Sequence, residues 1–368
     1  MRVPLLLNLL VCVGIAGAQA PKKSHFWFRC YPGLMVKYDP VTDKEVGRVK
    51  TVNGLCWDSY LSHDHKRIMV TTGKRAIIEE VDLEKMEVMD EHDFAENGYI
   101  VRVGSLKECP GGEKWYVRRD RIKINVDTFD ILDPEWLLYN REESEIEKKM
   151  KELPRAIRSG ARISPCGTKW HVFADGNIKI VDPETLKTEG EIDLKTPRYT
   201  GMGPISVRGT DLFNHKNPDA YRLVYSMRDS VKTSRTTYGV VDVSIKEKKV
   251  TKITEWGWAP SAFSWRLSRD GKRGVASAGR GGRGGGNLAG EPSVNLVLWD
   301  MENGKKLAEK RSIVRNGLGL AAFSPDGTKA YLIGRGHEFW VFDENLDHVK
   351  TVEMPGEILR GGIHVVDG

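Results

Sequence analysis

The segment with the most evident chemistry is LSHDHKRIMV, residues 61–70, in which His63 and His65 flank Asp64. Imidazole nitrogens and carboxylate oxygens are ligands that zinc accepts, so these three residues suggest part of a zinc site. A zinc site needs three or four convergent ligands, and only these three are local. No C-x-x-C pair, which would indicate a zinc ribbon or a thioredoxin-like site, occurs among the four cysteines beyond residue 20: Cys30, Cys56, Cys109 and Cys166.

Other segments of the chain repeat the pattern and favour a structural interpretation. LSHDHKRIMV aligns with ISPCGTKWHV (163–172), LSRDGKRGVA (267–276) and FSPDGTKAYL (323–332), and with the looser copies ECPGGEKWYV and NPDAYRLVYS. In the closest copies an apolar residue is followed by Ser, then by turn residues and a basic residue, and then by a strand of alternating apolar and polar residues. The His-Asp-His trio stands where other copies have Arg-Asp-Gly or Pro-Asp-Gly. We therefore predict a hairpin turn at 62–65, with no metal.

A second repeated feature is an apolar strand that ends in aspartate, a residue that caps backbone N–H groups in turns. Each repeat contains four short strands in a period of about 40–60 residues, which is the pattern of a β-propeller blade. We predict an all-β, seven-bladed β-propeller from the seven strand-ending aspartates: Asp39, Asp82, Asp127, Asp182, Asp242, Asp300 and Asp343.

The first strand-ending aspartate precedes any hairpin copy, so the chain opens within a blade. We predict that GGIHVV, residues 361–366, supplies the missing inner strand beside HFWFRC and closes the ring. One segment, 133–158, departs from the repeat. Its residues Ile146, Met150 and Leu153 have helical spacing and Pro154 follows them, which predicts a helical insertion.

The N-terminal residues have the features of a secretory signal. Arg2 precedes an apolar stretch from 4 to 17, and Ala18-Gln19-Ala20 fits a cleavage site. We predict a signal peptide at 1–20 and an exported propeller at 21–368, secreted or periplasmic. No later segment approaches the ~20 apolar residues of a membrane span, so we expect no membrane insertion.

The net charge of +6 does not by itself indicate nucleic acid binding, and we expect none. The tract GRGGRGGG (279–286) contains G-x-G-x-x-G, the fingerprint of dinucleotide binding. Because no helix is expected after it, the tract is interpreted as a flexible loop.

Two segments resemble the secreted YVTN-type β-propellers: RIMVTTGKRAIIEEVD (67–82) and KAYLIGRGHEFWVFD (329–343). Leu298-Trp299-Asp300 is also similar to the ending of a WD repeat. The resemblance covers the chain from residue 21 onward. It implies a layout similar to the heavy chains of quinoprotein amine dehydrogenases, which are scaffolds for a catalytic partner chain. We accordingly expect a monomer or a subunit of a hetero-complex. Other relatives are lactonases, so the resemblance leaves an enzyme open.

Charge is divided between the two faces of the expected propeller. One face, here the turn face, carries the first-to-second and third-to-fourth strand turns. The other, the loop face, carries the second-to-third strand loops and the links between blades. The third-to-fourth strand turns hold 8 basic and 18 acidic residues, whereas the loops of the loop face hold 11 basic and 5 acidic ones. Nine of the eleven are Arg, which grips carboxylate and phosphate groups bidentately.

We therefore predict a non-catalytic propeller that binds an anionic ligand or protein partner through its loop face. The predicted binding residues are five arginines of the loops and three of the links: Arg118, Arg119, Arg235, Arg280 and Arg283, and Arg158, Arg315 and Arg360.

The alternative is a metal-dependent hydrolase or lactonase with its site at the channel mouth. Three links contain Asn-Gly, at Asn53, Asn97 and Asn316, and asparagine carbonyls can bind calcium. Asn-Gly is also a preferred tight turn, and few acidic residues accompany these three. No G-x-S-x-G motif occurs, and the recurrent serines belong to the hairpin turns. We expect no cofactor, with calcium kept for the alternative.

Overall fold

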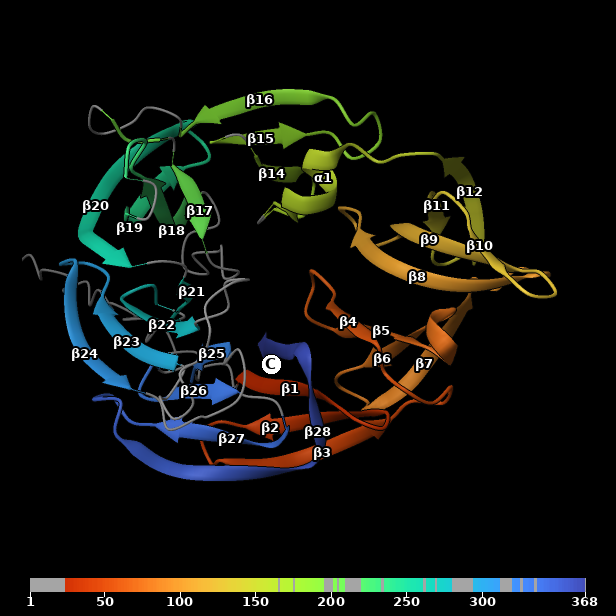
Figure 1. The fold of residues 1–368 in the computed structure, drawn as a ribbon, viewed down its shortest axis with the longest axis horizontal. Helices are drawn as coiled ribbons and strands as arrows, with labels where there is room; N and C mark the ends of the chain where they lie inside the picture. Colours follow the sequence, from red (N-terminus) through yellow and green to blue (C-terminus); the bar gives the residue numbers. More distant parts are fainter. Residues whose placement is uncertain are drawn as a thin grey trace, which may run out of the picture.

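A computed structural model describes residues 24–164, 166–174, 176–194, 201–203, 205–208, 220–232, 235–260, 263–268, 270–279, 294–311, 320–324, 327–333 and 336–367. In these residues the chain is nearly all β-strand, arranged as antiparallel sheets around a common axis (Figure 1). The signal peptide predicted at 1–20 lies outside the described residues. In the part described, no helix has the length and apolar character to cross a membrane.

Five sheets are built from consecutive strands. The first two are β4 (Asp58–Leu61), β5 (Arg67–Thr72), β6 (Ile77–Asp82) and β7 (Glu87–Asp93), and β8 (Tyr99–Glu108), β9 (Lys114–Ile124), β10 (Phe129–Ile131), β11 (Glu135–Asn140) and β12 (Glu145–Met150). The third and fourth are β13 (Ala161–Ile163), β14 (Trp170–Ala174), β15 (Asn177–Val181) and β16 (Thr188–Asp193), and β17 (Ser206–Arg208), β18 (Ala220–Arg228), β19 (Arg235–Ser244) and β20 (Lys249–Pro260). The fifth is β21 (Phe263–Leu267), β22 (Arg273–Gly279), β23 (Val294–Asp300) and β24 (Lys305–Arg311).

The sixth sheet joins the two ends of the described chain. Its strands are β25 (Leu320–Phe323), β26 (Ala330–Ile333), β27 (Gly336–Phe342), β28 (His348–Asp367), β1 (Ser24–Cys30), β2 (Leu34–Asp39) and β3 (Lys44–Lys50). The first half of β28 pairs with β27, and its last residues pair with β1, with Ile363 opposite Phe28 and Val365 opposite Phe26. The C-terminal segment therefore lies beside the N-terminal strand.

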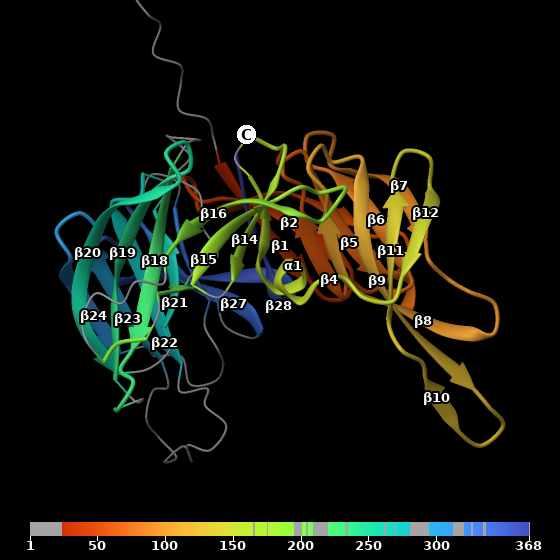
Figure 2. The same cartoon turned by 90° about the horizontal axis from the view of Figure 1, so that it is seen from above.

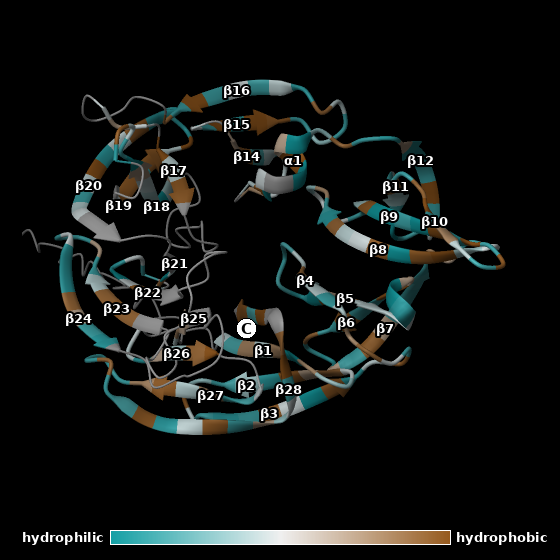
Figure 3. Ribbon diagram, viewed as in Figure 1, coloured by the Kyte–Doolittle hydropathy of each residue, from teal (hydrophilic) through white to brown (hydrophobic). Residues whose placement is uncertain are grey.

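Neighbouring sheets are held together by buried side chains from both. Trp27 and Met35 pack with Ile68 and Val81 of the next sheet, for example. Within the sixth sheet, Phe26 meets the ring of Tyr331 edge-on at 4.9 Å between centroids. Figure 3 shows hydrophobic colouring in strands such as β15 and hydrophilic colouring in many connecting turns. This is the pattern expected when sheets pack face to face and their turns meet solvent.

Most of the predicted turn aspartates cap the turn after a third strand. Asp82 and Asp182 each accept two backbone N–H groups, at 2.8–3.1 Å. Asp127 is a misassignment. It lies in the β9–β10 turn, and Asn140 is the equivalent cap, accepting the N–H groups of Glu142 and Glu143 at 3.1 and 3.2 Å.

The predicted helical insertion at 133–158 is wrong for most of its length. Residues 135–140 and 145–150 form β11 and β12, the outer strands of their sheet, and only α1 (Arg155–Gly160) is helical. Pro154 precedes this helix instead of ending one. The spacing of Ile146, Met150 and Leu153 favoured a helix because β12 is an edge strand with mostly charged, exposed residues. The alternation of apolar and polar residues that is typical of a strand is therefore weak in this segment. Pairing with β11 decided its conformation.

The irregular part of this sheet is a hairpin extension formed by β10 and the end of β9. It projects away from the ring, as Figure 2 shows. Val126 and Phe129 of this extension are exposed.

All four cysteines beyond residue 20 are free thiols, and only Cys166 is exposed.

Candidate functional site

The His63-Asp64-His65 segment forms the predicted hairpin turn. The hydroxyl of Ser62 donates to Asp64 at 2.6 Å, and the same carboxylate oxygen accepts the N–H of Lys66 at 3.0 Å. His65 has a positive φ of 58°, and its N–H donates to the carbonyl of Ser62 at 3.1 Å. Asp64, through its side chain, and His65, through its backbone, are thus used in making the turn.

The equivalent turn at Ser268 has the same geometry with glycine in place of His65. Ser268 donates to Asp270 at 2.7 Å, and Gly271 has a φ of 68°. Its N–H donates to the Ser268 carbonyl at 2.8 Å. His65 therefore occupies a position that suits glycine, which confirms the turn interpretation of the motif.

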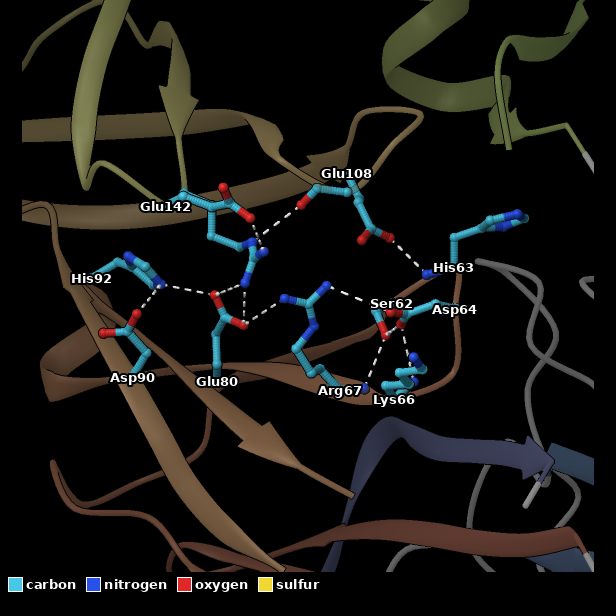
Figure 4. Close-up of polar contacts among 12 residues, drawn as sticks. Ser62, His63, Asp64, Lys66, Arg67, Glu80, Asp90, His92, Glu108 and Glu142 are labelled. Carbon is cyan, nitrogen blue, oxygen red and sulfur yellow. Dashed lines mark hydrogen bonds and ion pairs between the residues drawn. The ribbon is translucent and has the colours of Figure 1, made fainter. Parts of the chain in front are cut away.

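A buried ion cluster lies beside this turn and joins the β4–β7 and β8–β12 sheets (Figure 4). Its centre is Glu80, whose side chain is 1% exposed. Arg67 and Arg141 reach it at 3.4 and 3.2 Å, and Nε2 of His92 lies 2.9 Å from its Oε1. Burial acts to raise the pKa of Glu80, but the hydrogen bond from His92 and the charges of Arg141 and Arg67 outweigh it and lower the pKa. The cluster is a compensated structural network.

Glu80, Asp90 and His92 are also close enough together to suggest a metal site. Their partners argue for another role. Two guanidinium groups already neutralise Glu80, and Nδ1 of His92 lies 3.0 Å from the hydroxyl of Tyr139. A cation here would have to displace charges that satisfy a buried carboxylate, so this cluster is poorly suited to bind one.

Next to the ion cluster, the innermost strands β4, β8 and β13 enclose a pocket of about 230 Å³ on the turn face. Its polar lining comes from His63, Lys107, Glu108 and Arg162, with further lining by Tyr60, Leu61, Ser62, His65, Met69, Leu106, Ala161, Ile163 and Trp170. Oε2 of Glu108 accepts the backbone N–H of His63 at 2.7 Å. This hydrogen bond joins the pocket wall to the His-Asp-His turn (Figure 4).

The ionisable groups of the pocket are strongly perturbed. Burial raises the pKa of Glu108 to about 7, against smaller lowering effects of the His63 N–H and Arg67. Burial, followed by the charge of Arg162, lowers the pKa of Lys107 to about 8. Burial also lowers the pKa of Arg162. Such perturbation is typical of functional sites but also occurs in structural networks, so geometry must decide.

On the loop face, Arg118 and Arg119 are strand residues and not loop residues as predicted. They lie in β9 opposite Trp136 and Glu135 of β11. Arg119 is buried and paired with Glu96 at 2.7 Å and with Glu135, whereas Arg118 is 39% exposed and 2.9 Å from Asp120. Both charges are therefore compensated within the chain.

The other predicted arginines are placed only in part. Arg158 lies in the last turn of α1, and its guanidinium is 2.9 Å from the carboxylate of Glu152. Arg235 begins β19 and Arg360 lies in β28, but the placement of their side chains is not described. Arg280, Arg283 and Arg315 lie outside the described residues. The loop 279–286, apart from Gly279, does too.

Of the three asparagines considered as calcium ligands, two lie in the described part of the chain. The side-chain amide of Asn53 donates to Glu79 at 3.1 Å and to Glu91 at 2.8 Å. Asn97 is exposed, and Asn316 lies outside the described residues. The orientation of Asn53 thus follows from its carboxylate neighbours without an ion.

Four other cations of the loop face form no ion pair within the described residues. Lys74 and Arg75 belong to the turn between β5 and β6. Arg228 ends β18, and Lys232 follows it in the connection to β19. Within the described part of the chain, no ion pair joins any of these four to a carboxylate. The guanidinium of Arg75 lies 4.2 Å from the ring centroid of Trp57, which is 38% exposed.

Comparison with known proteins gives the fold. No protein-family model and no curated protein matches the chain, so membership of the YVTN family stays a prediction. The chain is similar to a solved structure described as the eukaryotic initiation factor, with 9% identity, a TM-score of 0.50, and 94% of this chain and 98% of that one covered. It is also similar to the dihydro-heme d1 dehydrogenase NirN, with 13% identity, a TM-score of 0.50, and 94% and 75% covered.

A further similar structure is the β-propeller domain of Myceliophteria thermophila Cps50 (Swd1), with 11% identity, a TM-score of 0.47, and 82% and 88% covered. At such identities similarity concerns the fold alone. The four-stranded antiparallel sheets arranged around one axis define the chain as a β-propeller (Figure 1).

Several residues of these sites were not among the predicted ones. Lys107 and Arg162 lie in inner strands, and the count of charged residues covered only loops and turns. Trp57 and Glu79 were also missed. The available signal was the Lys107-Glu108 pair, which follows directly after the buried Leu106 of an inner strand.

Proposed function

We propose that this propeller is a scaffold that docks an acidic protein surface on its loop face. The observation that carries the proposal is the turn Gly73–Arg75. Lys74 and Arg75 both have positive φ, 59° and 77°. For residues with a Cβ this conformation costs roughly 1–2 kcal/mol each, and such strain concentrates at functional sites. The turn holds two adjacent cations at the surface at the expense of stability.

The surroundings of this turn have the chemistry of a binding hot spot. Together with the exposed Val52, Leu55 and Trp57, Lys74 and Arg75 are here called the docking patch. Tryptophan and arginine dominate the binding energy of protein interfaces, and exposed apolar side chains beside them lose water on association. The two cations complement an acidic partner.

A buried carboxylate organises the docking patch before any partner arrives. Glu79 is 0% exposed and accepts the N–H groups of Val52 at 2.9 Å and Asn53 at 2.7 Å. It also accepts the hydroxyl of Thr72 at 2.8 Å, directly before the strained turn. One side chain thus positions the link and the turn together, which lowers the entropy lost on binding.

The test uses a labelled acidic peptide of glutamate and aspartate as the probe. Reversing Lys74 and Arg75 to Glu should weaken its binding at least ~10-fold, the effect expected for losing charged contacts. Reversing Lys305 and Lys306 on the turn face makes the same change in net charge and should have little effect. Added salt should weaken wild-type binding. Equal losses in the two double variants would overturn the proposal.

We further infer that the sixth sheet comprises two four-stranded blades sharing β28, which gives seven blades. The pairing of β28 with both β27 and β1 supports this inference. Deleting residues 359–368 removes the part of β28 that pairs with residues 24–28 of β1, and with it the buried Val366. The midpoint of thermal unfolding should therefore shift sharply downward, or the transition should lose cooperativity. An unchanged midpoint would contradict closure by this strand.

We also propose that the chain is exported after cleavage behind Ala20, as its N-terminal sequence suggests. N-terminal sequencing of the protein recovered from the periplasm or medium should begin at Pro21. Recovery of the uncleaved chain only from the cytoplasm would overturn this.

A further inference from the structure

We propose that the pocket between β4, β8 and β13 binds a small anion carrying a phosphate or carboxylate group, held by Lys107 and Arg162. The pocket is on the turn face, opposite the docking patch, so this site is separate from the scaffold function. Lys107 comes from β8 and Arg162 from β13, which places one cation on each of two neighbouring sheets.

The two cations lack the compensation found elsewhere. In the described part of the chain no ion pair joins either of them to a carboxylate, and Arg162 donates only to the carbonyl of Ala161, at 2.9 Å. In contrast, the buried or nearly buried arginines Arg67, Arg119 and Arg141 all meet acids. A half-buried, unpaired charge is costly, and two together also repel each other.

Glu108 lines the same pocket without neutralising the pair. Its Oε2 accepts the backbone N–H of His63 in the His-Asp-His turn (Figure 4). Burial raises its pKa to about 7, so near neutral pH a large fraction is protonated. The protonated carboxyl can donate to an oxygen of the bound anion. The pocket therefore offers a guanidinium, an ammonium and a carboxyl O–H to one ligand.

The size of the pocket limits the ligand. About 230 Å³ is below the range of drug-sized sites and fits an anion of a few heavy atoms. The guanidinium fork matches the oxygens of phosphate or carboxylate, and the ammonium adds a point charge. Tyr60 and Ile163 supply apolar walls, which suit a short carbon chain on a carboxylate ligand as well.

The experiment is a titration of the full chain with inorganic phosphate and with succinate, followed by calorimetry and thermal unfolding at constant ionic strength set with chloride. Wild type should bind at least one of them, and its midpoint should rise with concentration and saturate. Lys107→Met and Arg162→Met should each lower the affinity at least ~10-fold, the effect of losing a hydrogen bond to a charged group. Which of the two anions binds distinguishes a phosphate from a carboxylate ligand.

A second readout separates binding from a structural role. Without ligand, Lys107→Met should unfold at a higher temperature than wild type, because it removes an unpaired, half-buried charge. A structural lysine would behave in the opposite way. Lys306→Met, at an exposed lysine paired with Glu309, serves as the control and should retain the phosphate or succinate response. The proposal is overturned if neither anion binds wild type, or if Lys107→Met and Arg162→Met bind as wild type does. Should Lys107→Met fail to fold, Arg162→Gln carries the same test.

Discussion

Two pairs of cations lie on the same side of the propeller and have opposite environments. Arg67 and Arg141, from neighbouring sheets, converge on the buried Glu80. Lys107 and Arg162, also from neighbouring sheets, line a pocket in which no carboxylate of the described residues forms an ion pair with either of them. The first pair has the composition of a core ion network, and the second has the composition that we propose for an anion site.

The two pairs show how a cation that stabilises the fold can be distinguished from a cation that could bind a ligand. The number of basic residues on a face says little, because an arginine whose charge meets a carboxylate within the chain is already used. The same distinction divides the loop face, where Arg119 is compensated and Arg75 stacks on Trp57 instead. Compensation, and not basicity, identifies the candidate binding residues.

The largest expected effect breaks the compensated pair. Glu80→Gln keeps the shape of the side chain but removes the buried counter-charge of Arg67 and Arg141. The two arginines keep only the exposed carboxylates of Asp64 and Glu142. Stability in urea should fall by about 3–5 kcal/mol, the usual consequence of removing one member of a buried ion pair. Glu309→Gln, which breaks the exposed pair with Lys306, is the control and should change little. Similar values for the two variants would remove the distinction between the pairs.

A smaller effect is expected on the loop face, where the same comparison applies within one strand. Arg119→Met should cost about 2–3 kcal/mol, because it leaves the partly buried Glu135 with only the more distant Arg121. Arg118→Met, at the next residue, whose side chain is 39% exposed, should stay within about 0.5 kcal/mol of wild type. Urea denaturation of both variants measures this. Equal losses would mean that burial does not decide the role of these arginines.

The pH dependence of stability probes Glu108, which lies between the two pairs. Its pKa is about 7 in the folded protein and near 4.5 when unfolded, so between these values the folded state binds the extra proton. Stability therefore decreases as pH rises from 5 to 8. Glu108→Gln should lack this contribution, so the stability of wild type relative to the variant should fall over this range. A constant difference between the two proteins would show that Glu108 is not buried as described.

The smallest effect concerns the His-Asp-His turn. His65→Gly should raise stability by up to about 1 kcal/mol, because glycine adopts the positive φ at lower cost. His63→Ala should leave stability and metal content near wild type, as measured by unfolding and elemental analysis. Stoichiometric zinc that disappears in His63→Ala would overturn the assignment of this segment as a turn.

Much of the fold could be predicted because the repeat has a physical cause that is local. Ser62 and Ser268 recur since their hydroxyls organise a hairpin, and Asp82 and Asp182 recur since they cap a turn. Such contacts join residues a few positions apart, so they leave a trace in the sequence.

The remaining features depend on contacts between distant residues. Residues 145–150 form an edge strand because β11 pairs with them, a pairing that helical spacing in the sequence concealed. Likewise, the partner of Arg119 stands 16 residues away in Glu135, so compensation was invisible to a count of loop charges. Lys107 and Arg162 come together only when two sheets pack side by side.

The most direct test of the account is a crystal structure of the wild-type protein soaked in selenate, a tetrahedral dianion that anomalous scattering locates. We expect an anomalous peak between Lys107 and Arg162, further peaks at Lys74 and Arg75 of the docking patch, and none at Arg67, Arg119 or Arg141. Anions at the compensated arginines, or an empty pocket beside Lys107, would contradict the claim that compensation separates structural cations from binding ones.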